Sequence, residues 1–508
     1  MNRSRLTIIL FLYTGHVLIG TFYPFQFFGN SSQLLGQVFA RSFKLSSLTD
    51  FVNNVVLFLP FGFLLCCRRI IDREKTSSVL TSTAFAGAFS LAIELTQAIS
   101  SRNSSAFDVL ANTLGASVGA LLAAQLPTQM VGRFLSLVRK FMIMGVFVPI
   151  AVLLAALPIV LSIAQSTAPS AIWNPHFDFQ IGNEGTLNRP WFGKIHFVGL
   201  YNRALTAEQV KSNYDLGHVQ LSQQKPLPPS LVSLYAFREG QGNIVRDISE
   251  VKPPLDLSIG DQVAVRWLEG SEGIEILQPA ILRGREPITK LIEGFRATDE
   301  LSVEAWITPR DNLQSGPARI ISFSRDTRAR NFTLGQQGGL IEFRLRTPAS
   351  GLNGSPLALQ STESIPEFKK SHVVATYKNG LEIIYINGFP QSEVLDLKSD
   401  GIIGFGTRKT QVARAAYSFF YFFPVSFLVA AFLSSMVNPF LSRLVPLIIG
   451  AGLSLVAEVF QVLAFTRETD HSVILWSMFM AALGTFSGLA FALPERGINV
   501  LRTRGSFA

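Results

Sequence analysis

Ser90-Leu-Ala-Ile-Glu-Leu-Thr-Gln97 returns later in the chain as Ser454-Leu-Val-Ala-Glu-Val-Phe-Gln461. A second pair of stretches, Leu59-Pro-Phe-Gly-Phe-Leu64 and Phe423-Pro-Val-Ser-Phe-Leu428, has the same separation of 364 residues. Both copies of the first stretch place one Glu inside an apolar run. Two matches at one constant separation indicate an internal repeat, so two blocks of the chain are expected to fold alike.

Both copies lie within long apolar runs. Of the 508 residues, 48% are hydrophobic and 16% are charged, with a mean hydropathy of +0.33, which excludes an ordinary soluble protein. We interpret the first run, which follows a basic start, as an uncleaved anchor. Runs long enough to span a membrane occur at about residues 6–22, 51–67, 79–99, 107–126, 141–163, 415–433, 444–465 and 473–493. The sequence therefore predicts a polytopic α-helical membrane protein with about eight spans, arranged in two parallel repeats.

The character of the sequence changes between residues 165 and 414, where charges become dense and Gly, Pro and Asn interrupt short alternating runs such as Ser302–Ile307. His372–Tyr377, a Lys-Asn-Gly turn and Leu381–Ile386 together have the pattern of a β-hairpin. This pattern predicts an inserted antiparallel β-sandwich or barrel. The expected domains are residues 1–164 with five spans, residues 165–414 with the β-rich insert, and residues 415–508 with three spans.

The net charge of +9 is not spread evenly along the chain. The insert from Ser162 to Lys409 has 26 basic and 26 acidic residues, so the whole excess belongs to the membrane blocks. With the N-terminus inside, 13 basic residues flank the cytoplasmic side and 5 flank the outer side, as the positive-inside rule requires. We therefore expect cytoplasmic termini, a sandwich outside the cytoplasm and no nucleic-acid partner.

Polar residues gather near the expected outer side of the first membrane block. Glu94 and Gln97 lie three residues apart and share a helix face, and Asp108 and Asn112 lie four apart on the next helix. The full candidate pocket is Asp50, Asn53, Asn54, Glu94, Gln97, Arg102, Asp108 and Asn112. Carboxylates near hydrocarbon are costly and often functional, which predicts a binding or reactive pocket; the alternative is polar contact between helices without chemistry.

The second copy retains only part of this constellation. Glu458 and Gln461 keep the register, and Arg467 is one residue out of register with Arg102. At the same separation, Asp108 corresponds to Ser472 and Asn112 to Trp476. We expect the second membrane block to be a degenerate repeat.

The first block resembles the VanZ family of bacterial membrane proteins over residues 1–130. The resemblance depends on the polar residues from Asp50 to Asn54 that precede Leu57–Gly62, and on the pattern from Glu94-x-x-Gln97 to Gly119. It implies a multi-pass protein of the bacterial cytoplasmic membrane with a role in the cell envelope. The family is associated with reduced susceptibility to teicoplanin-type glycopeptides and has no established biochemical activity.

The insert resembles LamG or concanavalin A-like sandwiches through Leu234–Phe237, Ser302–Ile307, Phe332–Gln336 and His372–Gly388. In such domains a stretch like Ile181–Leu205 usually comes last, whereas here it comes first. We infer a circularly permuted sandwich, which requires residues 173–216 to pair with later strands. The resemblance implies glycan or protein binding, in some cases with calcium.

The residues themselves indicate no cofactor, because the six histidines lack metal-ligand spacing. Three functions remain open. The first is a binding protein whose pocket and sandwich hold a lipid-linked or envelope glycan, in polysaccharide biogenesis or glycopeptide resistance. The second is a membrane enzyme that uses Glu94 or Asp108, and the third is a scaffold for exopolysaccharide export. Membrane lipids are expected partners, and the sequence leaves the oligomeric state open.

Overall fold

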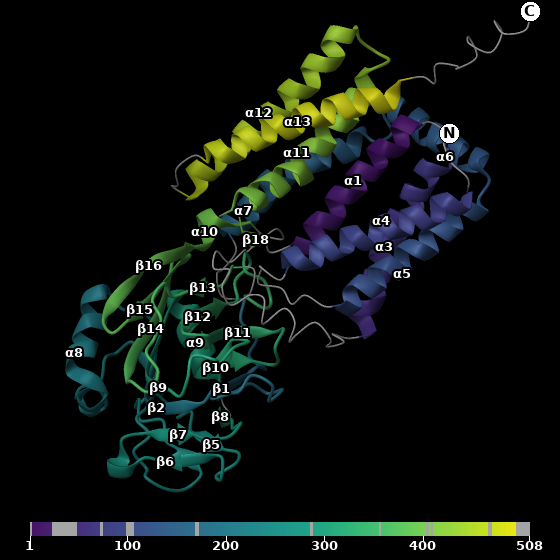
Figure 1. Cartoon of the computed structure of the whole chain (residues 1–508). Coiled ribbons are helices and arrows are strands. Elements are labelled where there is room, and N and C mark those ends of the chain that lie inside the picture. Colours follow the sequence, from purple (N-terminus) through teal and green to yellow (C-terminus); the bar gives the residue numbers. More distant parts are fainter. Residues whose placement is uncertain are drawn as a thin grey trace, which may run out of the picture. The chain divides into compact units, whose positions relative to one another are not determined.

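The computed structural model describes residues 3–22, 48–71, 75–97, 106–167, 172–284, 288–354, 357–402, 406–407, 410–465 and 470–493. The chain divides into two compact units (Figure 1). Residues 1–161 and 408–508 form one unit, here called the membrane unit, and residues 162–407 form the other, here called the sandwich.

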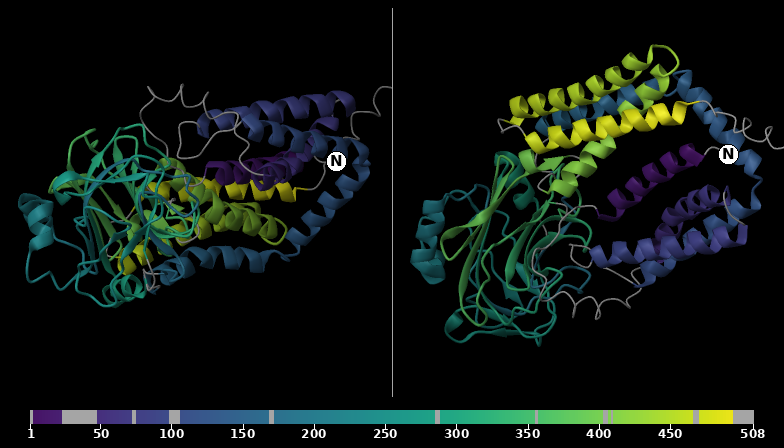
Figure 2. Two further views of the ribbon diagram at one scale, coloured as in Figure 1. Left: turned by 90° about the horizontal axis from the view of Figure 1, so that it is seen from below. Right: turned by 45° about the horizontal axis from the view of Figure 1, so that its top comes forward.

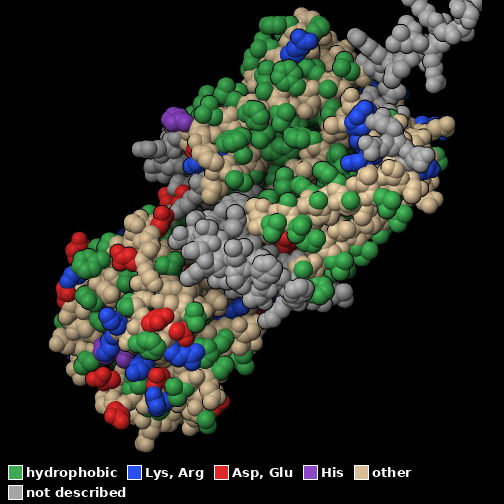
Figure 3. Space-filling model, viewed as in Figure 1, with side chains coloured by type: hydrophobic (Ala, Val, Ile, Leu, Met, Phe, Trp, Pro, Cys, Tyr) green, Lys and Arg blue, Asp and Glu red, His purple; other side chains and the backbone are tan. Residues whose placement is uncertain are grey.

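Helices build the membrane unit. They are α1 (Arg3–Phe22), α3 (Leu48–Ile70), α4 (Lys75–Gln97), α5 (Ala106–Gln125), α6 (Thr128–Ile143), α7 (Val148–Thr167), α11 (Gln411–Leu433), α12 (Pro439–Phe465) and α13 (His471–Ala492). In the described residues, seven of them are long and apolar enough to cross a membrane. Figure 3 shows apolar side chains over these helices, whereas charged side chains gather over the sandwich. An apolar outer surface is what lipid requires of a helix bundle.

The fifth expected span differs from the prediction. Residues 141–163 do not form one straight helix, because α6 and α7 meet at a bend of 69°. Gly145 lies in the break with a φ of +77°, a conformation that glycine adopts without strain. The pair raises the number of candidate spans to eight only if it is taken as one broken span.

The two repeats correspond helix by helix, with α3, α4 and α5 matching α11, α12 and α13. The first helix of each copy contains an internal proline, Pro60 or Pro424. Buried positions on α4 recur on α12 at the expected 364-residue separation. Examples are Ser78 with Ser442, Ser90 with Ser454, and Glu94 with Glu458.

The third helices correspond with a separation of 365 residues, one more than the sequence match gave. The buried positions Asn112, Ala116, Gly119 and Ala120 then correspond to Ser477, Ala481, Gly484 and Thr485. Gly119 packs against the carbonyl of Leu59, and Gly484 packs against that of Phe423, the counterpart of Leu59. The expected pairing of Asp108 with Ser472 and Asn112 with Trp476 is therefore wrong, because the second copy has an additional residue before α13.

The sandwich consists of two antiparallel sheets. The first contains, in spatial order, β13 (Leu359–Gln360), β12 (Leu340–Leu345), β11 (Arg330–Gln337), β10 (Ala318–Ser324), β1 (Asp178–Ile181), β8 (Leu282–Gly284), β5 (Leu257–Ile259) and β4 (Ile244–Val245). The second contains β16 (Phe389–Asp396), β15 (Leu381–Ile386), β14 (Ser371–Lys378), β9 (Glu300–Pro309), β2 (Gly193–Tyr201), β7 (Ile274–Ile276) and β6 (Val265–Trp267), with β3 (Leu231–Tyr235) beside β2.

Short elements complete this unit: α8 (Ala207–Gln223), η1 (Glu269–Ser271), α9 (Thr289–Thr298), α10 (Leu397–Asp400), β17 (Gly401–Ile402) and β18 (Gly406–Thr407).

The earliest strands of the sandwich lie in the middle of its sheets. Strand β1 pairs with β10, with Phe179 opposite Phe323, and β2 pairs with β9, with Val198 opposite Ala305. Residues 173–216 thus pair with later strands, which is the condition that a circularly permuted sandwich must meet.

Successive side chains of β9 point to opposite faces of the sheet and belong to two different hydrophobic cores. Val303, Ala305 and Ile307 face the core between the sheets, whereas Glu304 and Trp306 point to the opposite face. Helix α8 covers that outer face, as Figures 1 and 2 show, and Val210 and Leu221 of α8 join Trp306 in the second core. The face of this sheet that points away from the other sheet is therefore covered by α8 around Trp306 and is not exposed to solvent there.

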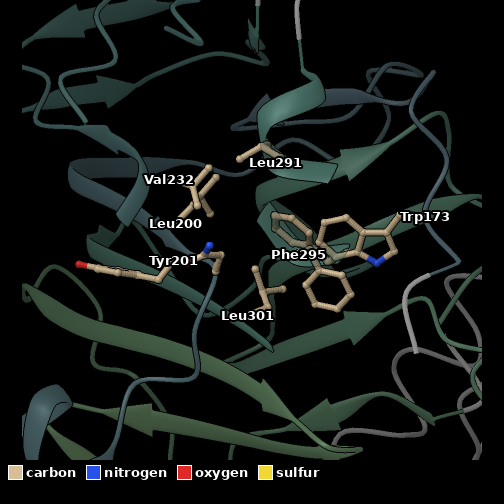
Figure 4. A pocket seen from close by; sticks show the side chains of 9 residues that line it. Trp173, Leu200, Tyr201, Val232, Leu291, Phe295 and Leu301 are labelled. Carbon is tan, nitrogen blue, oxygen red and sulfur yellow. The ribbon is translucent and has the colours of Figure 1, made fainter. Parts of the chain in front are cut away.

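Two other tryptophans of the sandwich, Trp191 and Trp173, serve packing. Trp191 is fully buried, and Trp173 stacks on Phe295 with ring centroids 4.1 Å apart. Figure 4 shows this aromatic group beside an apolar gap of about 10 Å³. The gap is too small for a sugar, so Trp173 acts as a core residue.

Candidate functional site

Three of the predicted pocket residues form a buried polar strip in the membrane unit. Glu94 and Gln97 on α4 are 7% and 6% exposed, and the Gln97 amide donates to the Thr21 carbonyl of α1 over 2.7 Å. Asn112 on α5 is 2% exposed and donates through Nδ2 to Ser90 Oγ over 2.9 Å. Since Ser90 lies one helical turn from Glu94, these bonds place α1, α4 and α5 around one polar strip.

Asn112 has an unused acceptor. Its Oδ1 is buried and has no hydrogen-bond partner among the described residues. A buried amide oxygen without a partner costs free energy, on the order of 1–3 kcal/mol. This atom is therefore the clearest place in the strip at which a ligand donor would be stabilised.

The remaining predicted pocket residues are less enclosed or lie outside the described part. Asp108 is half-buried in the first turn of α5, one turn before Asn112. On α3, Asn54 is half-buried and Asn53 is exposed, so the side chain of Asn53 lies outside the buried strip. The side chain of Asp50 and all of Arg102 lie outside the described residues.

The second repeat encloses its glutamate differently. Glu458 is 1% exposed, and its Oε2 accepts from the backbone N–H of Asp470 over 3.3 Å. Asp470 caps α13 and pairs with Arg414 Nε over 2.8 Å. The side chain of Gln461 and all of Arg467 lie outside the described residues. Sequence reasoning missed the Arg414–Asp470 pair, although Arg414 lies 364 residues after Asp50 and so replaces an acid with a base.

Two arginines do more than set the topology. Arg5 is 2% exposed and donates to the carbonyls of Phe491 and Leu493 over 3.2 and 2.9 Å. Arg139 donates to the carbonyl of Ala492 over 2.7 Å. Both guanidinium groups thus bind the C-terminus of α13, where a helix offers unpaired carbonyls and partial negative charge.

A buried carboxylate lies under α8 in the sandwich. Glu304 is fully buried and accepts hydrogen bonds from Tyr201 Oη over 2.6 Å and from Asn213 Nδ2 over 3.1 Å, while His372 Nε2 lies 2.7 Å away. Burial raises the pKa of the Tyr201 hydroxyl well above its usual value, and the adjacent Glu304 adds to the shift. Trp306 stacks on His372 with centroids 4.7 Å apart. The enclosed carboxylate fixes α8 to the sheet.

A solvent-connected hollow of about 410 Å³ lies near the end of α8. Its lining comes from β2, α8, the end of β3 and the segment around η1: His196, His218, Val219, Ser222, Gln223, Ala236, Arg238, Gly270 and Glu272. Burial lowers the pKa of His196 and of His218 to about 4, and Lys370 acts in the same direction on both. Both imidazoles are therefore neutral near pH 7. Sequence reasoning missed this hollow because its lining comes from separate segments.

The described residues contain no group of three or more His, Cys, Asp or Glu arranged to hold a metal ion. Cys66 and Cys67 are free and buried in the membrane unit.

The fold and these sites define a multi-helix membrane protein that carries a lectin-type β-sandwich. Residues 10–132 match the family described as VanZ/LLP1, and residues 289–412 match the concanavalin A-like lectin/glucanases superfamily. Both resemblances inferred from motifs are thereby confirmed: the chain contains a VanZ-like domain and a concanavalin A-like domain. No curated protein and no solved structure matches the chain.

Proposed function

We propose that this protein binds a lipid-linked or cell-surface glycan in the bacterial cytoplasmic membrane. The buried strip at Glu94, Gln97 and Asn112 would hold the polar group of the lipid at the outer leaflet, and the lectin-type sandwich would bind the attached saccharide. Its role would lie in polysaccharide biogenesis; reduced glycopeptide susceptibility is the role that the VanZ resemblance implies.

The buried amide of Asn112 carries this proposal. The second repeat packs its first and third helices through the corresponding glycine, Gly484 in place of Gly119, yet it has Ser477 at the position of Asn112. Packing of this kind of bundle therefore does not need an asparagine there. An amide with an unused acceptor, kept in one copy and replaced in the other, supports a ligand-binding role better than a purely structural one.

The glutamates support binding more than catalysis. Glu94 has its counterpart in Glu458, although the second repeat has lost Asn112 and has Val473 at the position of Asp108. A glutamate and a glutamine that are retained where the counterparts of Asp108 and Asn112 are lost favour a non-reactive role for the carboxylate. The membrane enzyme with Glu94 or Asp108 as its reactive group, and the export scaffold, remain the alternatives.

The test uses the full chain in lipid nanodiscs, loaded with lipid-linked saccharides extracted from bacterial envelopes. Native mass spectrometry then measures the bound fraction. Asn112→Ser gives the first repeat the side chain of the second, so we expect normal folding and at least tenfold weaker binding. Ser477→Ala is the matched control and should bind like the wild type.

Equal binding by Asn112→Ser and the wild type would contradict the proposal. Glu94→Gln separates the enzyme alternative, because binding tolerates an amide whereas proton transfer does not. Chemical conversion of the bound lipid by the wild type, lost in Glu94→Gln with binding retained, would favour the enzyme.

A further inference from the structure

The hollow beside α8 has the features of a binding site. Gly217 breaks α8 with a φ of 74° and a ψ of 158°, and the short second part of the helix turns His218, Ser222 and Gln223 toward the hollow. A volume of about 410 Å³ falls within the range of small-ligand pockets, roughly 300–1,000 Å³. The hollow is therefore large enough for the end of a saccharide chain.

One buried polar atom of a lining residue lacks a partner. His218 Nε2 is buried without a hydrogen bond in the described part of the chain. The ring nitrogens of His196, by contrast, already contact the Glu272 carbonyl and Thr308 Oγ1, at 2.8 and 3.0 Å. An unsatisfied buried polar atom on a residue that lines a hollow is stabilised by a ligand that supplies hydroxyl groups.

The charges around the hollow favour an anion. Arg238 lines it, Lys370 acts on both of its histidines and Lys194 on His196, whereas Glu272 is the single acidic lining residue. Arg238 donates to the Val219 carbonyl over 3.2 Å, which positions a planar guanidinium at the wall. A guanidinium pairs with a carboxylate through two parallel hydrogen bonds, which a neutral sugar does not offer.

We propose that this hollow binds the end of an acidic saccharide, with Arg238 on the sugar carboxylate and His218, Ser222 and Gln223 on its hydroxyl groups. Val219 and Ala236 would contact the apolar face of the sugar ring. The proposal rests on the glycan-binding function proposed above and adds the class of sugar and the place where it binds.

The test measures binding of a galacturonic acid trisaccharide and of the neutral galactose trisaccharide of the same linkage to the full chain in nanodiscs, by isothermal titration calorimetry. We expect the acidic sugar to bind at least tenfold more tightly, and more weakly as salt is added. Arg238→Ala should lower that affinity at least tenfold. Arg266→Ala is the matched control, because this guanidinium is exposed on the same sheet and pairs with Glu275.

A second variant, Ser222→Trp, fills the hollow without changing its charge and should also abolish binding. Unchanged melting temperatures would show that both variants fold. Equal affinity for the two sugars, absence of binding to the wild type, or full binding by both variants would each overturn the assignment. None of these results would contradict ligand binding at the buried polar strip of the membrane unit. That proposal is tested separately by Asn112→Ser, with lipid-linked ligands and in a different unit of the chain.

Discussion

Glu304 shows how one buried acid organises a face of the sandwich. Donors from two strands and from α8 converge on its carboxylate, and Asn213 provides the link to the helix. Removing the acceptor would leave several buried donors unsatisfied at once. Each unsatisfied buried donor costs about 1–3 kcal/mol of folding free energy, so Glu304 contributes strongly to the stability of the sandwich.

We expect Glu304→Ala to lower the free energy of unfolding of the sandwich by about 3–5 kcal/mol, because it leaves several buried hydrogen-bond donors without their acceptor. Tyr201→Phe removes one donor and should cost about 1–2 kcal/mol. Urea unfolding followed by tryptophan fluorescence measures both, since Trp306 lies against this cluster. Arg266→Ala, in an exposed pair, should change stability by less than about 1 kcal/mol. A Glu304→Ala protein as stable as this control would contradict the assignment.

At the level of single residues, helical spacing predicted that Glu94 and Gln97 share one face of a helix, and both are buried on α4, as Asn112 is on α5. Helical spacing could not predict the hydrogen bonds of Arg5, because its acceptors are backbone carbonyls 486 and 488 residues away. It also could not predict the hollow at His218, because the lining residues are brought together by strand pairing and by the kink in α8.

At the level of elements, glycines form the contact between α3 and α5. A Cβ on Gly119 would lie 1.9 Å from the Leu59 carbonyl oxygen, and one on Gly115 would lie 2.2 Å from that of Val55. Gly484 and Gly488 make the equivalent approach of α13 to α11. Small residues that allow backbones to approach closely are a common way to join helices in lipid.

Gly119→Ala should force α3 and α5 apart and destabilise the membrane unit by about 1–3 kcal/mol, the usual cost of overpacking. Gly20→Ala on α1 is the control, because no atom of the described residues lies within 4 Å of the added carbon. Scanning fluorimetry in detergent compares their melting temperatures. If both variants melt together with the wild type, the close contact does not limit stability.

The sequence predicted the long elements well because hydrophobic length and alternation persist over many residues. It failed at short ones: β4 to β8 contain two or three residues each and depend on neighbours for their pairing. The extra residue before α13 was also missed, since a constant separation was assumed across a loop. Buried positions on both sides of that loop were needed to locate the shift.

At the level of the whole molecule, the lengths of the apolar runs and the alternating pattern of the insert predicted the division into a helical part and a β-rich part, and the family resemblance implied a sandwich. The sidedness of the two units stays a prediction based on the distribution of Lys and Arg. Cysteine labelling is suited to test it, because native Cys66 and Cys67 are buried at 0% and 2% exposure.

We expect Leu313→Cys, at a position 88% exposed in the sandwich, to react with a membrane-impermeant maleimide on intact cells. Gln129→Cys, exposed at the start of α6, should react only after the cells are permeabilised. The unaltered chain measures the background from its own cysteines. Labelling of Gln129→Cys on intact cells, with Leu313→Cys labelled only after permeabilisation, would contradict the predicted orientation and indicate the opposite one.

The matching burial patterns of α4 and α12 have a consequence for how this protein changes over time. Because one polypeptide contains both helix bundles, α3–α5 and α11–α13, the two are always made in equal numbers and do not have to meet by diffusion. A substitution in one bundle also leaves the other unaltered, which is impossible for two identical subunits made from one coding sequence. One copy is thus free to specialise while the other preserves the shape, and the exchange of Asn112 for Ser477 is such a divergence.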